Sequence, residues 1–393
     1  MPVIALALVV GAIACPGVQA QTFKVLHSFT PGTDGANPLA GLAIDSAGNL
    51  YGTTTSGGNF GNGTVFKLTT SGKETILHSF AGSTDGSNPE AGLLLIGGNL
   101  YGATTQGGSG GRGTVFQVTT AGKETVLHLF TSQAQGAQPQ GRLAADAAGN
   151  LYGTTSAGGK AGKGVVFKLT RPATTAGVWS EQVLYNFSAG AGGANPVAGV
   201  AFDKAGNLYG TTSAGGTGYG TVFQLTPSTS GWTEKVLHSF AMQSDGGVPY
   251  GGLVVDSLGN LYGAATDGGG GGSAGGGTVF ELTPSSLGWS FKVLYQLPGW
   301  GISGSFRNLL LISGKIYATT HCDGSHNAGT VFELTPAGST WKYTSLHVFT
   351  GGNDGLFSFS NLVMDAQGNL YGTTQEGGAH GDGVVFKITP LGP

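Results

Sequence analysis

The sequence predicts an all-β protein, a seven-bladed β-propeller built from four-stranded antiparallel blades. Three observations predict this fold class: a repeat of 50 to 57 residues runs along the chain, each copy contains four short strand-like segments, and no segment keeps a helical period. A Leu-Tyr-Gly core marks the repeat. Its tyrosine occupies Tyr51, Tyr101, Tyr152, Tyr209, Tyr262, Tyr317 and Tyr371. Four-stranded units repeated around an axis are the blades of a propeller.

Each repeat is predicted to be a meander of four strands. In the first complete copy, the apolar run 41–45 and the Thr- and Tyr-rich run 50–55 form a hairpin across a Gly-Asn turn. A glycine-rich loop, 56–63, leads into a third strand at 64–69. A second short turn then leads into the fourth strand, 75–80.

The strand count predicts how the ring closes. A strand of the fourth type, 23–29, precedes the first complete repeat, whereas the last copy stops after its third strand, 384–389. We therefore expect 23–29 to pair with the last blade. This pairing closes the ring without a covalent bond and leaves no free sheet edge.

Residues 1–20 are predicted to be a signal peptide, which leaves 21–393 as a single propeller domain. They contain an apolar run, too short to span a bilayer, that ends in the small-residue pattern Val18-Gln19-Ala20. We expect a protein that is secreted, periplasmic or held at the cell surface. Without the leader, Cys322 is the only cysteine, so no intrachain disulfide is expected.

Composition excludes two classes of partner. Charged residues make up 9% of the chain and the net charge is -3, so we expect no basic stripe for nucleic acid and no cationic face for a membrane. The 76 glycines fall at fixed places in the repeat and indicate turns rather than disorder. A monomer is expected.

The repeated segments GNLYGTT, GTVFKLT and LHSF resemble the GloVer-type tandem repeat of secreted and surface-anchored bacterial proteins, and the match covers residues 22–389. The resemblance implies a β-propeller. It implies no particular reaction and brings no catalytic residues. The chain ends directly after its last strand, at Pro390-Leu391-Gly392-Pro393, which favours a freely secreted or periplasmic product over an anchored one.

Residues that recur in every blade are first interpreted as scaffold. Histidines recur at one position of the fourth strand, where we expect a ring packed on the blade with one polar partner. Aspartates recur at the end of the first strand, where they can accept hydrogen bonds from the following turn. These residues are His27, His78, His128, His238 and His347, and Asp45, Asp146, Asp203, Asp256 and Asp365.

The sixth repeat breaks the pattern and suggests a metal site. It carries His321, Cys322, Asp323 and His326 where other copies have mostly Ser, Gly and Ala, and His380 holds the place of His326 in the seventh repeat. Imidazole, thiolate and carboxylate groups are transition-metal ligands. The alternative is a set of exposed loop residues without function. Our expectation is that the protein has no cofactor. The two alternatives are a transition metal bound by these residues and a Ca²⁺ ion bound in the Asp-Gly loops between blades.

A second candidate site lies at the start of the first strands, which should surround the mouth of the central channel. Its residues are Glu90, Arg142, Tyr250, Phe306, Arg307 and Phe359. Aromatic rings stack on sugars, while arginine and glutamate bind hydroxyl or carboxylate groups. The alternative is packing that plugs the channel.

The sequence favours a non-catalytic binding protein that recognises an extracellular glycan or protein through loops on one face. No catalytic residue is assigned, because no Ser/His/Asp set or carboxylate pair stands at a recognisable spacing. One alternative is an extracytoplasmic metal-dependent enzyme, a lyase, hydrolase or lactonase. Another is a structural cell-surface protein.

Overall fold

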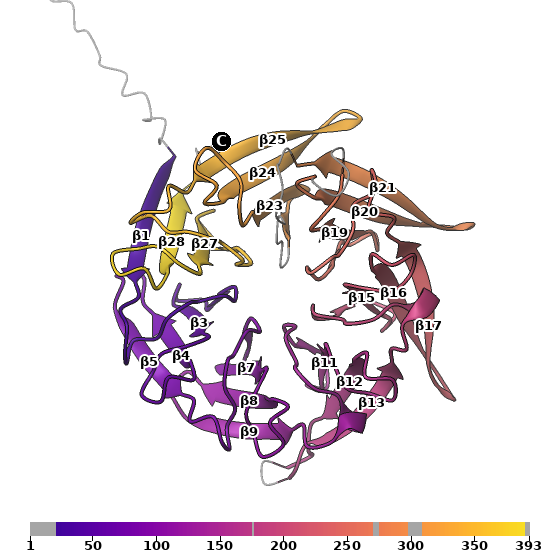
Figure 1. The fold of residues 1–393 in the computed structure, drawn as a ribbon, viewed down its shortest axis with the longest axis horizontal. Helices are drawn as coiled ribbons and strands as arrows, with labels where there is room; N and C mark the ends of the chain where they lie inside the picture. Colours follow the sequence, from indigo (N-terminus) through magenta and orange to yellow (C-terminus); the bar gives the residue numbers. More distant parts are fainter. Residues whose placement is uncertain (1–20, 175–176, 270–274, 298–308, 390–393) are drawn as a thin grey trace, which may run out of the picture.

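In the computed structural model, seven four-stranded antiparallel sheets stand in a ring (Figure 1). The structure describes residues 21–174, 177–269, 275–297 and 309–389. In each sheet the strands follow one another from the channel to the rim. The predicted fold class and blade number are confirmed.

Each blade contributes four strands, given in order from the channel outward. Blade 1 contains β2 (Ala43–Ile44), β3 (Leu50–Thr54), β4 (Thr64–Leu68) and β5 (Glu74–Ser79). Blade 2 contains β6 (Leu94–Ile96), β7 (Asn99–Thr104), β8 (Thr114–Thr119) and β9 (Glu124–Leu129). Blade 3 contains β10 (Ala144–Ala145), β11 (Leu151–Thr155), β12 (Val165–Thr170) and β13 (Ser180–Asn186). Blades 4 and 5 contain β14 (Ala201–Phe202), β15 (Leu208–Thr212), β16 (Thr221–Ser228) and β17 (Gly231–Ser239); β18 (Val254–Val255), β19 (Leu261–Ala265), β20 (Thr278–Ser285) and β21 (Gly288–Gln296). Blades 6 and 7 contain β22 (Leu310–Ile312), β23 (Lys315–Thr319), β24 (Thr330–Ala337) and β25 (Thr340–Val348); β26 (Val363–Met364), β27 (Leu370–Thr374), β28 (Val384–Thr389) and β1 (Thr22–Ser28).

Helical structure in the described residues is confined to two short 3₁₀ turns in the loops between blades, η1 (Gln133–Gln135) and η2 (Gly190–Gly192). Neither the length nor the hydropathy needed to cross a bilayer is found in any helix of this part of the chain.

The first strand closes the ring, as predicted. β1 pairs antiparallel with β28, from Thr22 opposite Thr389 to Ser28 opposite Val384. A bulge after Val25 shifts the register, as it does between the third and fourth strands of the other blades. The seventh sheet is therefore assembled from both ends of the described chain (Figure 1).

A close contact between a glycine and a phenylalanine explains the two most regular sequence motifs. Gly52 of β3 lies directly opposite Phe66 of β4. A Cβ atom at Gly52 would lie only 2.5 Å from the Phe66 Cζ atom. The Leu-Tyr-Gly motif thus makes room for the ring of the Thr-Val-Phe motif, and a side chain at the glycine would push the ring out of its place.

The hydrophobic core lies between neighbouring blades. Phe29, which follows β1, packs edge-to-face on Phe66 at 5.2 Å between ring centroids, and both rings are fully buried. The same pair recurs at the next contact, where Phe80 meets Phe116 at 5.0 Å. Each blade therefore buries its apolar face against the next, and the contact between blades 7 and 1 is built like the others.

The recurrent aspartates act as predicted on the turn between the first two strands. Asp45 accepts hydrogen bonds from the backbone N–H groups of Ala47 and Asn49, and also from the Tyr51 hydroxyl at 2.9 Å. Burial alone would raise the pKa of Asp45, but the Asn49 and Tyr51 donors together hold it below the usual value. The repeat tyrosine therefore fixes the turn of its own blade.

Ring closure can be tested with two matched substitutions. Phe29→Ala at the closing contact and Phe130→Ala between blades 2 and 3 each remove a fully buried ring. In a closed ring each should lower the free energy of unfolding by about 3–5 kcal/mol, because each leaves a cavity. Urea unfolding measures this. A small effect of Phe29→Ala beside a large effect of Phe130→Ala would contradict closure.

Candidate functional site: the mouth face

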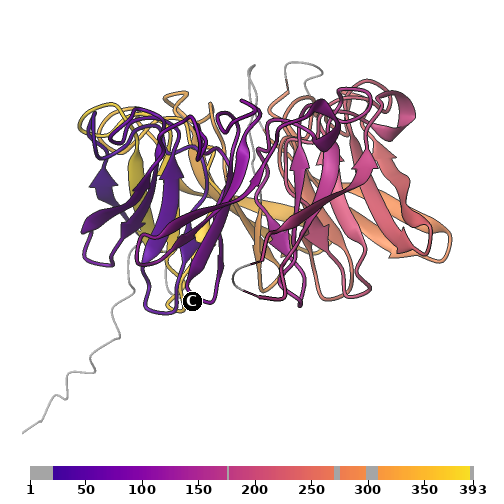
Figure 2. The ribbon, with the colours of Figure 1, turned by 90° about the horizontal axis from the view of Figure 1, so that it is seen from below.

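Two sets of loops share one face of the ring, which we call the mouth face (Figure 2). They are the loops between the second and third strands, such as 55–63, and the loops between blades, such as 29–42. Ala36 forms a β-bridge with Ser56 of blade 1, while the adjacent Asn37 donates from its N–H to the Asp382 carbonyl of blade 7 at 2.9 Å. Each inter-blade loop in the described part of the chain is tied in this way to both blades that it joins. The backbone bond from the inter-blade loop to the preceding blade recurs at other joints. Its N–H donors and carbonyl acceptors are Asn88 to Asn62, Gln138 to Arg112, Asn195 to Lys163, Val248 to Tyr219 and Phe357 to Ala328.

The residue that donates this N–H to the preceding blade has a positive φ angle in each described inter-blade loop. Asparagine tolerates this conformation, but Val248 at 51° and Phe357 at 62° do not, because a β-branched or bulky side chain crowds the backbone there. Such strain costs about 1–3 kcal/mol and persists where the surroundings impose it. The bonds to both neighbouring blades supply that constraint.

Three predicted channel-mouth residues, Glu90, Arg142 and Tyr250, line one cavity on the axis. Its volume is about 20 Å³, which is room for about one water molecule. Part of the Arg142 side chain is exposed to solvent, although protein atoms surround most of it. Its Nε donates to the Leu93 carbonyl at 3.1 Å. Desolvation lowers the pKa of its guanidinium group. Phe306 and Arg307 lie outside the described residues.

The backbones of adjacent blades pack closely beside the axis. A Cβ atom on Gly141 would lie 2.3 Å from the Gly199 nitrogen, and one on Gly41 would lie 2.5 Å from the Asn361 Cβ. The glycines therefore let the innermost strands converge on the axis. The cavity lined by Glu90, Arg142 and Tyr250 is therefore too small for a ligand the size of a sugar.

His321 and Phe359, taken from the two different predicted sites, are in contact. The imidazole of His321 lies between the rings of Phe357 and Phe359, with centroid distances of 4.3 and 4.0 Å. Its Nδ1 atom is buried and makes no hydrogen bond. At the equivalent position of blade 1, the Thr55 hydroxyl instead donates to the Asn37 carbonyl at 3.0 Å. Burial lowers the pKa of His321 to about 4, so the ring is neutral at physiological pH.

Cys322, Asp323 and His326 share the loop of His321, whereas His380 lies in the equivalent loop of blade 7, and all four are less enclosed than His321. Cys322 is partly buried, and burial together with Asp323 raises the pKa of its thiol. Asp323 accepts a hydrogen bond from Thr320, while His326 and His380 are exposed. No three of these five residues bring ligand atoms within 4.8 Å of one another in the described structure. The metal site in these loops stays a prediction.

Exposed aromatic side chains gather on the mouth face. Among the described Phe, Tyr and Trp residues, the exposed ones are Phe60, Tyr219 and Tyr250, and all three belong to its loops. The large exposed aliphatic residues lie in turns or at strand ends on the opposite face: Ile96, Val178, Leu258, Leu287 and Ile312. The two faces therefore differ in surface chemistry.

The rim histidines have the polar partners that were predicted, with one exception. Four of them contact the aspartate seven residues later: His27 with Asp34, His78 with Asp85, His238 with Asp245 and His347 with Asp354. The exception is His128, whose Nε2 is buried without a hydrogen bond because Gln135 stands in place of the aspartate.

One cluster was missed by sequence reasoning. Glu74 joins His27 and Asp34, and their ligand atoms all lie within 4.8 Å of one another. The available signal was a glutamate at the start of the fourth strand in the first four repeats, at Glu74, Glu124, Glu181 and Glu234. The glutamates alone do not indicate which residues they contact, because His27 comes from the preceding blade and Asp34 from the loop that joins the two blades.

The fold and the mouth face define a closed seven-bladed propeller that presents aromatic and polar loops on a rigid ring. The chain belongs to the Gloeobacter/Verrucomicrobia repeat family, whose model matches residues 16–217, 173–297 and 218–392. The resemblance inferred from the repeated segments is thereby confirmed.

Comparison with solved structures returns matches at low similarity. One is an oxidoreductase described as a glucose dehydrogenase from Thermus thermophilus, with 16% identity and a TM-score of 0.46, covering 94% of this chain and 100% of that one. Another is a glucose dehydrogenase with 14% identity and a TM-score of 0.47, covering 79% and 97%. No curated protein matches the sequence. Similarity at this level carries no argument about activity.

The state of His321 can be measured by NMR titration of labelled histidine. We expect the ring to stay neutral down to about pH 5, because its pKa is about 4. In the unfolded chain, the His321 side chain has a pKa of about 6.5 and takes up a proton at a higher pH than in the folded protein. The full contribution of His321 to the free energy of unfolding is therefore present above pH 6.5, and part of it is lost as the pH falls from 6.5 towards 4. Phe359→Ala uncovers the ring and should raise this pKa. A pKa near 6.5 in the unaltered protein would refute the buried geometry.

Proposed function

We propose that this protein is a non-catalytic binding propeller that recognises an extracellular glycan with its mouth face. The observation that carries the proposal is the segregation of exposed rings: Phe60, Tyr219 and Tyr250 all lie on that face. Sugars present flat C–H surfaces that pack on aromatic rings and hydroxyl groups that need hydrogen-bond partners. A face with rings among glycine, serine, threonine and asparagine loops offers both.

The strongest candidate for the binding surface lies between blades 4 and 5. The Val248 N–H donates to the Tyr219 carbonyl at 2.7 Å, and Tyr250 follows two residues later in the same loop. This bond ties the loops that carry the two tyrosines to each other. Rings fixed before binding lose little entropy when a ligand arrives, which favours affinity.

The weak overall charge supports a neutral or weakly charged ligand. The chain carries a net charge of -3, and only 9% of its residues are charged. Electrostatic steering is therefore small, and affinity has to come from stacking and hydrogen bonds. An extracellular location is part of the proposal, supported by the signal-like sequence of residues 1–20.

A glycan array followed by titration calorimetry tests this function. We expect the purified protein to bind at least one class of glycan, and Tyr219→Ala and Tyr250→Ala each to weaken binding about tenfold, which corresponds to the loss of one stacking contact. Leu287→Ala is the control, since Leu287 is 99% exposed in a turn on the opposite face. A glycan bound equally by all variants would place the site elsewhere. Binding to no glycan would leave a protein ligand, an enzyme or a structural role as the explanation.

A further inference from the structure

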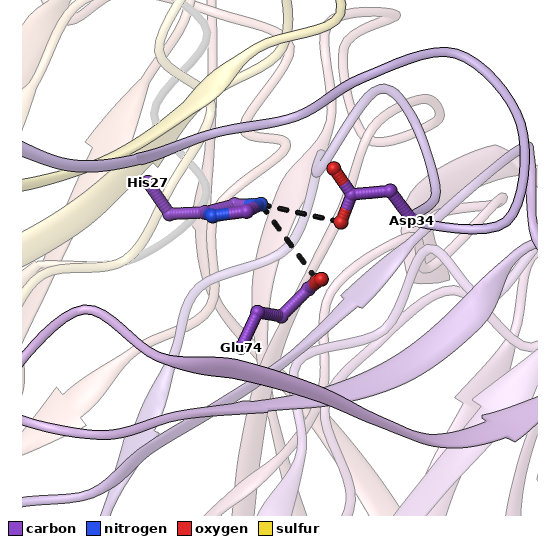
Figure 3. Close-up of side chains that lie close together, drawn as sticks. All are labelled: His27, Asp34 and Glu74. Carbon is purple, nitrogen blue, oxygen red and sulfur yellow. Dashed lines mark hydrogen bonds and ion pairs between the residues drawn. The ribbon is translucent and has the colours of Figure 1, made fainter.

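The seam where the ring closes brings together three side chains of metal-ligand type (Figure 3). His27 lies on β1, the closing strand; Asp34 lies in the loop that leaves it; Glu74 lies on β5, the rim strand of blade 1. The His27 Nε2 atom is 3.3 Å from Asp34 Oδ1 and 3.8 Å from Glu74 Oε1. The cluster therefore spans the contact between the last sheet and the first.

Two of the acceptor atoms in this cluster are poorly satisfied. Glu74 Oε1 is buried and has no hydrogen-bond partner. Asp34 Oδ2 accepts bonds from the Thr30 N–H and hydroxyl, both at 2.8 Å, whereas Oδ1 makes a longer contact with His27, and the Asp34 carboxyl also faces that of Glu74. Two carboxylates that face each other need a proton or a cation between them.

The next seam contains the same three residue types but a different arrangement of hydrogen bonds. There His78 contacts Asp85 at 3.0 Å, and Glu124 supplies the third group. Both oxygens of Asp85 accept the Ala81 N–H, and one of them also accepts the Gly82 N–H. Both oxygens of Asp85 are thus already used by its own loop, which leaves it less able than Asp34 to bind a cation.

Two further seams replace the glutamate with a ring. Phe291 stacks on His238, and Phe23 stacks on His347, each at 3.7 Å between centroids. A stacked ring blocks the space that a metal ion would need. Among the described seams, the one between blades 7 and 1 is therefore distinguished by having three ligand groups, one of them an aspartate with an oxygen to spare.

We propose that His27, Asp34 and Glu74 bind a zinc ion that bridges the closing strand to blade 1. Zinc bonds to imidazole nitrogen and carboxylate oxygen are about 2.0–2.2 Å long, so tetrahedral ligands lie about 3.4 Å apart. The His27 distances of 3.3 and 3.8 Å fit this spacing with little movement. Imidazole in the ligand set favours zinc over calcium or magnesium, which prefer oxygen alone.

The site has room for the rest of the coordination shell. The three ligands open onto a groove of about 750 Å³ on the outside of the ring, whose walls include Asn59 and Phe60. Water can enter there and take the fourth position, as in zinc sites that have three protein ligands. The ion would neutralise the two facing carboxylates and add a direct link between the closing strand and β5, beside the backbone bonds that the intervening loop makes to blades 7 and 1.

Metal binding to the full-length protein, stripped with a chelator and titrated with zinc chloride, tests the proposal. We expect one tightly bound zinc per chain and a higher unfolding temperature in its presence. Glu74→Gln keeps the shape of the side chain and should weaken binding at least about tenfold while abolishing the thermal shift. Asp34→Asn should do the same. The matched control is Glu124→Gln at the next seam, which should bind zinc like the unaltered protein.

A second control separates this site from the loop residues of blades 6 and 7. A variant combining Cys322→Ser, His326→Ala and His380→Ala should keep the bound zinc and the thermal shift. Cobalt offers an independent readout, because its visible absorption reports nitrogen and oxygen ligands and should disappear in His27→Gln. Absence of stoichiometric zinc, retention of zinc by Glu74→Gln, or its loss in the loop variant would each overturn the proposal.

Discussion

The contact between a glycine in the second strand and a phenylalanine in the third is the constraint on which the ring depends. At Gly52 and Phe66 it lets an aromatic ring lie flat across the neighbouring strand, where Phe29 of the preceding blade meets it. Blade 6 varies this arrangement, with Ala318 opposite Phe332 and Leu297 as the residue from blade 5. The interface tolerates one methyl group there, but each blade still presents a phenylalanine to its neighbour.

Because the frame is fixed by these buried rings, the loops above it are free to differ. Their stems are held by backbone bonds to two blades, and these bonds keep Val248 and Phe357 in a strained conformation. Those residues adjoin Tyr219, Tyr250 and His321, the side chains that give the mouth face its chemical character. Rigid stems with variable tips are a common basis for recognition.

Sequence periodicity was sufficient to predict the blades and their closure, because a residue such as Tyr51 has the same neighbours in every copy. It could not predict contacts between unlike positions of adjacent blades. The contacts of Glu74 with His27 and of His321 with Phe359 depend on the angle at which two neighbouring sheets pack. That angle cannot be inferred from the spacing of residues along the sequence. The width of the channel likewise depends on backbone approach at Gly141 and Gly199, and residue types alone do not define it.

The pairing of β1 with β28 imposes an order on biosynthesis. During translation β1 emerges first but finds its partner only when 384–389, the last strand of the chain, has been made. Until then the first blade lacks its neighbour, and Phe29 and Phe66 remain open to solvent or to other chains. Such a long-range contact is slow to form and leaves the nascent protein prone to exchanging strands with a second molecule. A chaperone that shields the amino-terminal strand would therefore protect the ring more than one acting on any later blade.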